Sequence, residues 1–230
     1  MKKLGIIGAM DIEIQTLKEN IENLTVTEKA GAEYYEGTMH GLPVVLVKCG
    51  IGKVNAAIGA QILCDCFGVT HIVNTGIAGS LCAEQEIGDM VVSSDVWHHD
   101  FDCVAFGYPM CRIPGMPHSF AADRTMIALA QQAAEQTGST VRIGRIASGD
   151  QFVADAALKN QIIQRTQALC TEMEGAAIAQ TAYRNAVPFV ILRCISDKAD
   201  NSAEMDYPSF EAMAARHCAQ VAMSLAQALC

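Results

Sequence analysis

The sequence lacks several features that would assign it to other classes of protein. No segment reaches the ~18 uninterrupted apolar residues of a membrane span. The apolar run near the N-terminus is too short for the core of a signal peptide, and we expect it to form the first strand. Basic residues are few: 16 Lys and Arg against 25 Asp and Glu give a net charge of −9, which argues against a nucleic-acid partner. Small polar substrates remain open.

The ten cysteines form neither a C-x-x-C pair nor a paired zinc spacing. Several have apolar neighbours, among which a thiol behaves as a small hydrophobe. A reduced, cytoplasmic setting is the simple inference. The run of His98, His99 and Asp100 might suggest metal ligands, but adjacent histidines point to opposite sides of a strand. We therefore expect no metal there.

The order of the apolar segments predicts the fold class. A hydrophobic content of 51% can fill a sizeable core, and 230 residues fit one large domain better than two small ones. No linker, internal repeat or low-complexity segment interrupts the chain, so residues 1–230 are predicted to form a single domain. Strands are expected at 4–8, 33–38, 44–47, 71–74, 87–92, 142–147 and 187–192, with helices between them. This alternation is typical of an α/β fold.

The sequence predicts where two of the helices begin and end. An amphipathic helix is expected over 123–136, and a last helix is expected to contain Pro208 in its first turn and to end near 229. Residues 76–79 follow a strand and include the small residues Gly76, Ala78 and Gly79, so they are expected to form a tight turn whose backbone amides can bind a hydroxyl or an anion.

Acidic residues gather where predicted strands end. Glu172 and Glu174 follow a short strand, and Asp197 follows the apolar run 187–192. Loops at the ends of strands converge in an open α/β sheet and suit chemistry. Any one of these acids alone is best interpreted as an ordinary residue of a helix start or a loop. As a group, together with Glu13 near the N-terminus, they favour a functional site.

The turn at 50–52 resembles two nucleotide-binding motifs only in part. Gly50 and Gly52 match the opening of a dinucleotide fingerprint, but Asn55 stands at the third glycine. Val54 replaces the Ser or Thr of a phosphate loop. The turn is therefore interpreted as one that lets backbone approach a ligand. A second irregular segment, 105–116, is apolar and rich in proline, as lids and interfaces often are.

Six motifs occur together in one order and spacing, and they carry a family resemblance. The chain resembles the bacterial 5′-methylthioadenosine/S-adenosylhomocysteine nucleosidases over essentially its whole length. The resemblance implies a nucleoside phosphorylase-like fold, with a central mixed β-sheet, partly barrel-like, flanked by helices. It also implies a homodimer without metal or cofactor. The motifs are Gly5-Ile-Ile-Gly-Ala-Met-x-x-Glu13, Gly50-Ile-Gly-Lys-Val54, Asn74-Thr-Gly-x-Ala-Gly79, Ser148-Gly-Asp-x-Phe152, Glu172-Met-Glu174 and Ile195-Ser-Asp197.

The resemblance further implies hydrolysis of the adenine–ribose bond by water. By the match, Asp197 is the acid beside N7 of adenine, which requires its pKa to rise by ~2–3 units through burial. Ser196 orients it. Glu13 is the base that activates water on the other face of the ribose, and Arg193 holds the Glu13 carboxylate.

The remaining implied contacts surround an adenine nucleoside. Glu174 binds the ribose hydroxyls, Met173 lies against the sugar, Phe152 stacks on adenine and Val153 reads its edge. The implied binding set also includes Glu172 from the same motif, Tyr207 over sugar and base, Met10 and Ile51 at the 5′-thio group, Ile77 beside the water, and Phe106 and Pro114 from the partner subunit.

Two departures and three rivals qualify this interpretation. Ile77 stands where many relatives have Ser, and 206–208 differ from the usual lid. A purine nucleoside phosphorylase would need a phosphate site, yet the first turn carries Asp11 and Glu13, which repel phosphate. An aminodeoxyfutalosine nucleosidase shares the motifs. A non-catalytic nucleoside-binding protein would need no acids on both faces of the ribose.

Overall fold

The computed structural model describes residues 1–230. The strands are β1 (Leu4–Gly8), β2 (Glu22–Lys29), β3 (Ala32–Met39), β4 (Leu42–Lys48), β5 (His71–Ser80), β6 (Met90–His98), β7 (Phe120–Ala121), β8 (Val141–Ser148), β9 (Cys170–Glu172) and β10 (Phe189–Asp197). The helices are α1 (Asp11–Glu19), α2 (Lys53–Asp65), α3 (Arg124–Gln136), α4 (Ala156–Thr166), α5 (Gly175–Arg184) and α6 (Ala203–Leu229), with a 3₁₀ turn η1 (Val104–Phe106). Strands alternate with helices through most of the chain, as the sequence predicts.

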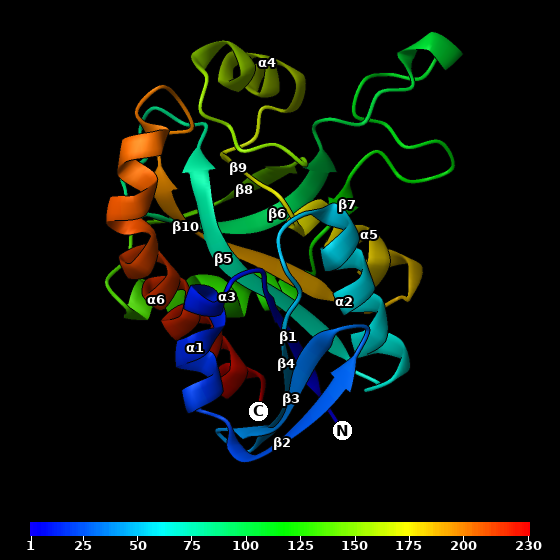
Figure 1. Ribbon diagram of the computed structural model, residues 1–230, viewed down its shortest axis with the longest axis vertical. Coiled ribbons are helices and arrows are strands. Elements are labelled where there is room, and N and C mark those ends of the chain that lie inside the picture. The colour runs from blue at the N-terminus through cyan, green and yellow to red at the C-terminus, as the bar shows by residue number, and fades with distance from the viewer.

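All ten strands belong to one mixed sheet, and half of it closes on itself. The order is β10-β6-β8-β9-β5-β1-β4-β3-β2, with β7 beside β6. Because β10 also pairs with β5, the strands β10, β6, β8, β9 and β5 form a closed ring, from which β1, β4, β3 and β2 extend (Figure 1). This arrangement confirms the predicted mixed, partly barrel-like sheet flanked by helices.

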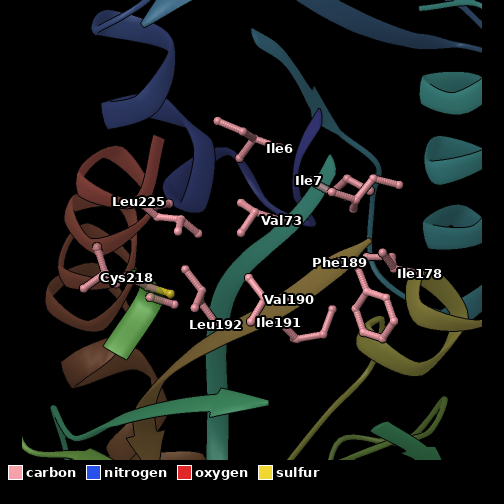
Figure 2. Close-up of a cluster of buried hydrophobic side chains, with 14 of the residues drawn as sticks. Ile6, Ile7, Val73, Ile178, Phe189, Val190, Ile191, Leu192, Cys218 and Leu225 are labelled. Atoms are coloured by element: carbon pink, nitrogen blue, oxygen red, sulfur yellow. The ribbon is translucent and has the colours of Figure 1, made fainter. Parts of the chain in front are cut away.

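Helices cover both faces of the central strands. Helix α6 packs on β10 and β5 and contacts α1 and α3, while α2 and α5 pack against each other on the other side (Figure 1). Figure 2 shows the core between them, with Leu192 near Cys218 and Val73 near Leu225 of α6, and Phe189 near Ile178 of α5. Strands buried on both faces need apolar residues at successive positions, which explains the continuous apolar runs in β1 and in the first half of β10.

The parallel pairing sets where a site can form. Strand β1 lies between β4 and β5, and β5 pairs with β10, all in parallel. The carboxyl ends of these four strands therefore meet at one edge of the sheet, where their following loops converge. No helix is both long and apolar enough to cross a bilayer.

The predicted turn at 76–79 is wrong. Strand β5 continues through these residues to Ser80 and pairs with β10 up to Gly79. The small residues are needed for close packing rather than for a turn. A Cβ at Gly76 would lie 2.5 Å from Glu13 Oε1, and one at Gly79 would lie 2.8 Å from Asp197 Oδ1.

The predicted start of the last helix is also wrong. Helix α6 begins at Ala203, so Pro208 lies inside it rather than in its first turn. The carbonyl of Ser202 accepts hydrogen bonds from Met205 and Asp206, which establishes the helix before the proline is reached. Proline lacks an N–H, but this close to the helix end its absence removes only one backbone bond.

Candidate active site

A cavity of about 480 Å³ lies at the carboxyl edge of the central strands. Nearly all of the predicted site residues line it: Met10, Glu13, Ile51, Ile77, Phe152, Val153, Glu172, Met173, Glu174, Ser196, Asp197 and Tyr207. Arg193, Phe106 and Pro114 do not line it. The cavity is walled by residues from many separate segments, which only the fold brings together.

Glu13 reaches into the cavity from the first turn of α1. Its carboxylate accepts hydrogen bonds from the backbone N–H groups of Ala9 at 2.6 Å, Met10 at 3.1 Å and Ile77 at 3.2 Å. Burial raises the pKa of Glu13, while the positive charge of Arg193 and these three amides oppose the rise. The carboxylate is thus fixed in orientation by backbone groups.

Arg193 does not form the expected ion pair with Glu13. Its Nη2 instead pairs with Glu172 and lies 3.6 Å from Glu174, and it donates to Asn74 Oδ1 at 2.6 Å. The guanidinium and Glu13 face each other across Gly76, where a Cβ would lie 2.7 Å from Nη1 of Arg193. Arg193 therefore acts on Glu13 only through its charge. It is buried behind the cavity wall rather than in it.

Glu172 and Glu174 share this guanidinium, but their pKa values shift in opposite directions. Glu172 accepts from the Ser148 hydroxyl and from the backbone N–H of Gly175 at 2.7 Å. Burial would raise its pKa, but Arg193 and these donors outweigh burial and lower it. Glu174 accepts from the N–H of Gly52 at 2.8 Å. Burial and the neighbouring Glu172 raise the pKa of Glu174 to about 7.

Asp197 lies at the end of β10 in a different environment. None of the ion pairs of the protein involves it. Its carboxyl accepts from the Ser196 hydroxyl and from the N–H of Ala199, both at 2.8 Å. Burial raises its pKa, and the acids Asp206 and Asp200 add to the rise. This direction agrees with the expectation for a proton donor, and Ser196 contacts Asp197 as expected.

Another part of the cavity lining is aromatic and apolar. The rings of Phe152 and Tyr207 meet edge to face, with centroids 5.5 Å apart. The Tyr207 hydroxyl lies 3.4 Å from Met10 Sδ. Phe152 and Ile51 are each about half exposed, so their surfaces are open to a ligand. A flat ring could stack on Phe152, and an apolar group could lie near Met10 and Ile51.

Phe106 and Pro114 lie in the irregular segment 101–119, outside the cavity of their own chain. Phe106 is 81% exposed, and Pro114 is exposed as well. In Figure 1 this segment stands out from the body of the molecule, on the side away from α6.

Sequence reasoning quoted Asn74 and Ser148 in its motifs but gave them no role, and both support the site from behind. Asn74 is buried in β5, where its amide donates to the carbonyl of Ile7 at 2.8 Å and its oxygen accepts from Arg193. Ser148 joins Glu172 to the start of α5. A polar side chain inside an apolar strand was the available signal for Asn74. The histidines His98 and His99 are both buried, and no group of three or more potential ligands is arranged to hold a metal ion.

Comparison with known proteins identifies the family. The model of the Phosphorylase superfamily matches residues 3–228. A 5′-methylthioadenosine/S-adenosylhomocysteine nucleosidase of Halalkalibacterium halodurans is 42% identical over 98% of both chains. The crystal structure of the Neisseria meningitidis nucleosidase of the same name, in complex with methylthio-immucillin-A, superposes with a TM-score of 0.97 at 37% identity, covering 99% of this chain and 100% of that one.

A futalosine hydrolase of Helicobacter pylori also superposes, with a TM-score of 0.93 at 31% identity over 97% of both chains. Full-length identity near 40% is found with relatives of the first name. From its matched family model, its relatives and its fold, the chain belongs to the phosphorylase superfamily and, within it, to the 5′-methylthioadenosine/S-adenosylhomocysteine nucleosidases.

Proposed function

We propose that the protein is a purine nucleosidase that hydrolyses the N-glycosidic bond of 5′-methylthioadenosine and S-adenosylhomocysteine, releasing adenine and the 5-thioribose product. Its family supports this activity. The observation that carries the proposal is a cavity lined by two buried acids in different settings: Asp197 without a cationic partner, and Glu13 held by three amides. Such a pair can protonate a leaving group and activate water.

Asp197 is the proposed general acid. When the bond between N9 of adenine and C1′ of the ribose breaks, its electron pair goes to the base. A proton delivered to N7 neutralises that charge, so adenine leaves as a neutral molecule. Asp197 suits this role because burial raises the pKa of its carboxyl, which favours the protonated form, and Ser196 fixes its orientation.

Glu13 is the proposed general base. It takes a proton from water on the opposite face of the ribose, and the oxygen bonds to C1′. The sugar carries positive charge as the old bond breaks. Glu13, Glu172 and Glu174 surround one guanidinium, that of Arg193, so this side of the cavity is negative when all three are ionised. The arrangement stabilises the cationic transition state more than the neutral substrate.

The other cavity residues have proposed roles in binding. Glu174 accepts hydrogen bonds from the ribose hydroxyls, with Met173 along the sugar. Phe152 stacks on adenine, Val153 pairs with its edge through the backbone, and Tyr207 covers base and sugar. The remaining contacts are Met10 and Ile51 at the 5′-thio group and Ile77 beside the attacking water.

Water is the better nucleophile than phosphate in this cavity. None of its lining residues is Lys, Arg or His, so a phosphate dianion would meet carboxylates without a compensating cation. The alternative activity that remains is hydrolysis of aminodeoxyfutalosine. It is supported by the fold of the Helicobacter pylori futalosine hydrolase. Aminodeoxyfutalosine and methylthioadenosine both carry adenine on a ribose.

Adenine release from four nucleosides tests these assignments. The substrates are methylthioadenosine, S-adenosylhomocysteine, 5′-deoxyadenosine and aminodeoxyfutalosine, each assayed with and without phosphate. Phosphate-independent release from the first two supports the nucleosidase. Phosphate-dependent release indicates a phosphorylase, and recovery of intact nucleoside indicates a binding protein. A strong preference for aminodeoxyfutalosine indicates the alternative hydrolase.

We further propose that two copies of the chain complete each cavity as a twofold dimer in the cytoplasm. Large apolar side chains are exposed on the 101–119 segment, at Val104, Phe106 and Tyr108, and their exposure favours a covering partner. Phe106 and Pro114 would close the partner's 5′ end. All ten cysteines are free, as suits a reducing compartment.

Phe106→Ala tests the shared cavity. It is expected to raise KM for methylthioadenosine more than for adenosine, which lacks the apolar 5′ group, by the equivalent of about 1–3 kcal/mol. Sedimentation at the assay concentration gives the oligomeric state. A fully active monomer would refute the dimer.

A further inference from the structure

A charged cluster that the proposed mechanism does not use lies beside the cavity. Lys53 Nζ is 2.6 Å from Asp100 Oδ1 and 3.9 Å from Asp150 Oδ2. The backbone N–H of Lys53 donates to Asp150 Oδ1 at 2.8 Å, and that of Asp150 donates to Asp100 Oδ2 at 3.0 Å. The three residues therefore form a closed set in which each bonds to both others.

The cluster joins three segments that are distant in sequence. Lys53 begins α2 directly after the turn 50–52, Asp100 follows β6, and Asp150 follows β8. The first segment carries Ile51 of the cavity wall, and the third carries Phe152 and Val153. The cluster thus ties the sugar side of the cavity to its base side.

The cluster is shielded enough for its charges to matter. The side chains of Lys53 and Asp100 are 19% and 20% exposed. Burial raises the pKa of Asp100, but Lys53 and the N–H of Asp150 outweigh burial and lower it. Pairs this far removed from water depend strongly on each other, because losing one partner leaves the other charge uncompensated.

Close packing transmits the position of the cluster to the site. Gly52, next to Lys53, donates its N–H to Glu174 at 2.8 Å, and a Cβ at Gly52 would lie 3.2 Å from Asp150 Oδ1. A Cβ at Gly149 would fall on the ring of His99. Gly52 is thus packed closely against Asp150, and Gly149 against His99.

We propose that Lys53, Asp100 and Asp150 are positioning residues, which hold the turn 50–52 and the segment 149–153 at the separation at which the cavity binds a nucleoside. This inference rests on the proposed function. None of the three residues lines the cavity, and the acids of the proposed chemistry lie on other elements. The cluster therefore governs binding far more than the chemical step.

Kinetics of three variants test the proposal. Lys53→Met removes the charge at similar length, and KM for methylthioadenosine is expected to rise by roughly tenfold while kcat stays within about threefold. Lys53→Arg keeps the charge and is expected to restore KM to within about threefold of the wild type. Asp150→Asn, at a half-exposed position, tests the cluster if Lys53→Met does not fold, and it is expected to raise KM about threefold.

Lys3→Met is the matched control. Lys3 pairs with Glu36 at similar burial, but it lies at the opposite end of the sheet. The KM of Lys3→Met for methylthioadenosine is expected to equal that of the wild type. A KM for Lys53→Met within about twofold of the wild type overturns the proposal, as does a rise that Lys3→Met shares or that Lys53→Arg does not reverse.

Amide hydrogen exchange separates this proposal from the assigned activity. If the wild type releases no adenine, the proposed function is wrong, and the cluster can still be judged from protection of residues 50–52 and 149–153. Faster exchange in both segments of Lys53→Met, but not of Lys3→Met, supports the cluster. Unchanged exchange in these segments overturns it.

Discussion

The two ends of the cavity hold buried carboxyl groups in opposite electrostatic settings. At one end, Glu172 and Glu174 pair with the guanidinium of Arg193, and Glu13 faces it across Gly76. At the other end, Asp197 accepts only a hydroxyl and one backbone N–H, and its charged neighbours are acids. All four carboxyl groups are buried, so burial alone does not distinguish the two settings.

Arg193 and Asp197 make the contrast sharp because they lie four residues apart on the same strand, β10. The nearest lysine in sequence, Lys198, turns away to bond with the carbonyl of Gln85 and with Glu86. Asp197 has no cation beside it, whereas Glu13, Glu172 and Glu174 surround the single guanidinium of Arg193. The proposed roles of Asp197 as acid and Glu13 as base rest on this difference.

The largest expected effect comes from removing the isolated acid. Asp197→Asn keeps the shape of the side chain but cannot give up a proton. Turnover of methylthioadenosine is expected to fall by the equivalent of ~3–5 kcal/mol, with the melting temperature little changed. Adenine release and thermal unfolding measure the two quantities. Near-normal turnover would mean that Asp197 is not the acid.

Removing Arg193, the cation that Glu172 and Glu174 share, should destabilise the fold. Arg193→Met leaves Glu172 and Glu174 buried without a counter-charge, and the free energy of unfolding at pH 8 is expected to fall by ~3–5 kcal/mol. Urea denaturation gives this value. The control Lys3→Met disrupts a more exposed pair and should cost about 0–1 kcal/mol. Equal losses in the two variants would show that Arg193 is an ordinary ion-pair partner.

A smaller effect should distinguish Glu172 from Glu174, the two acids that share Arg193. The pKa of Glu174 is raised to about 7, whereas that of Glu172 is lowered. Below about pH 4.5 Glu174 is protonated in both the folded and the unfolded chain. Above pH 7 it is ionised in both, and burial of this charge destabilises the folded chain. Glu174→Gln is therefore expected to stabilise the protein by ~1–3 kcal/mol at pH 8 relative to the wild type, with the gain fading towards pH 4. A gain that does not vary with pH would exclude this titration.

The sequence pointed to the acids of the cavity because several of them gather at the ends of predicted strands, although each alone would pass for an ordinary helix-start or loop residue. It also predicted the limits of α3, since Asp123 caps that helix by accepting from the N–H of Met126. Strand β2 was missed because its residues are mostly polar and exposed. A polar edge strand of this kind lacks the alternating hydrophobic pattern from which strands are predicted.

Other misses concern distances between elements. The partner of Arg193 depends on how β9, α5 and α1 are placed around β10, which spacing along the chain does not encode. Gly76 and Gly79 indicated a turn, since glycine is common there, yet they are small because Glu13, Arg193 and Asp197 come from other elements to occupy the space. Pro208 indicated a helix start, but the bonds to Ser202 had already begun the helix.

The most direct test of the contrast between the two ends is the titration of Asp197 itself. Carboxyl ¹³C NMR of the wild type, assigned by the signal lost in Asp197→Asn, gives its pKa in the free protein. The account predicts a pKa clearly above the ~3.9 of an ordinary Asp, in contrast to Asp100, whose pairing with Lys53 lowers its pKa. A pKa of Asp197 at or below the ordinary value would contradict the account, because the carboxyl would then have no proton to give to adenine.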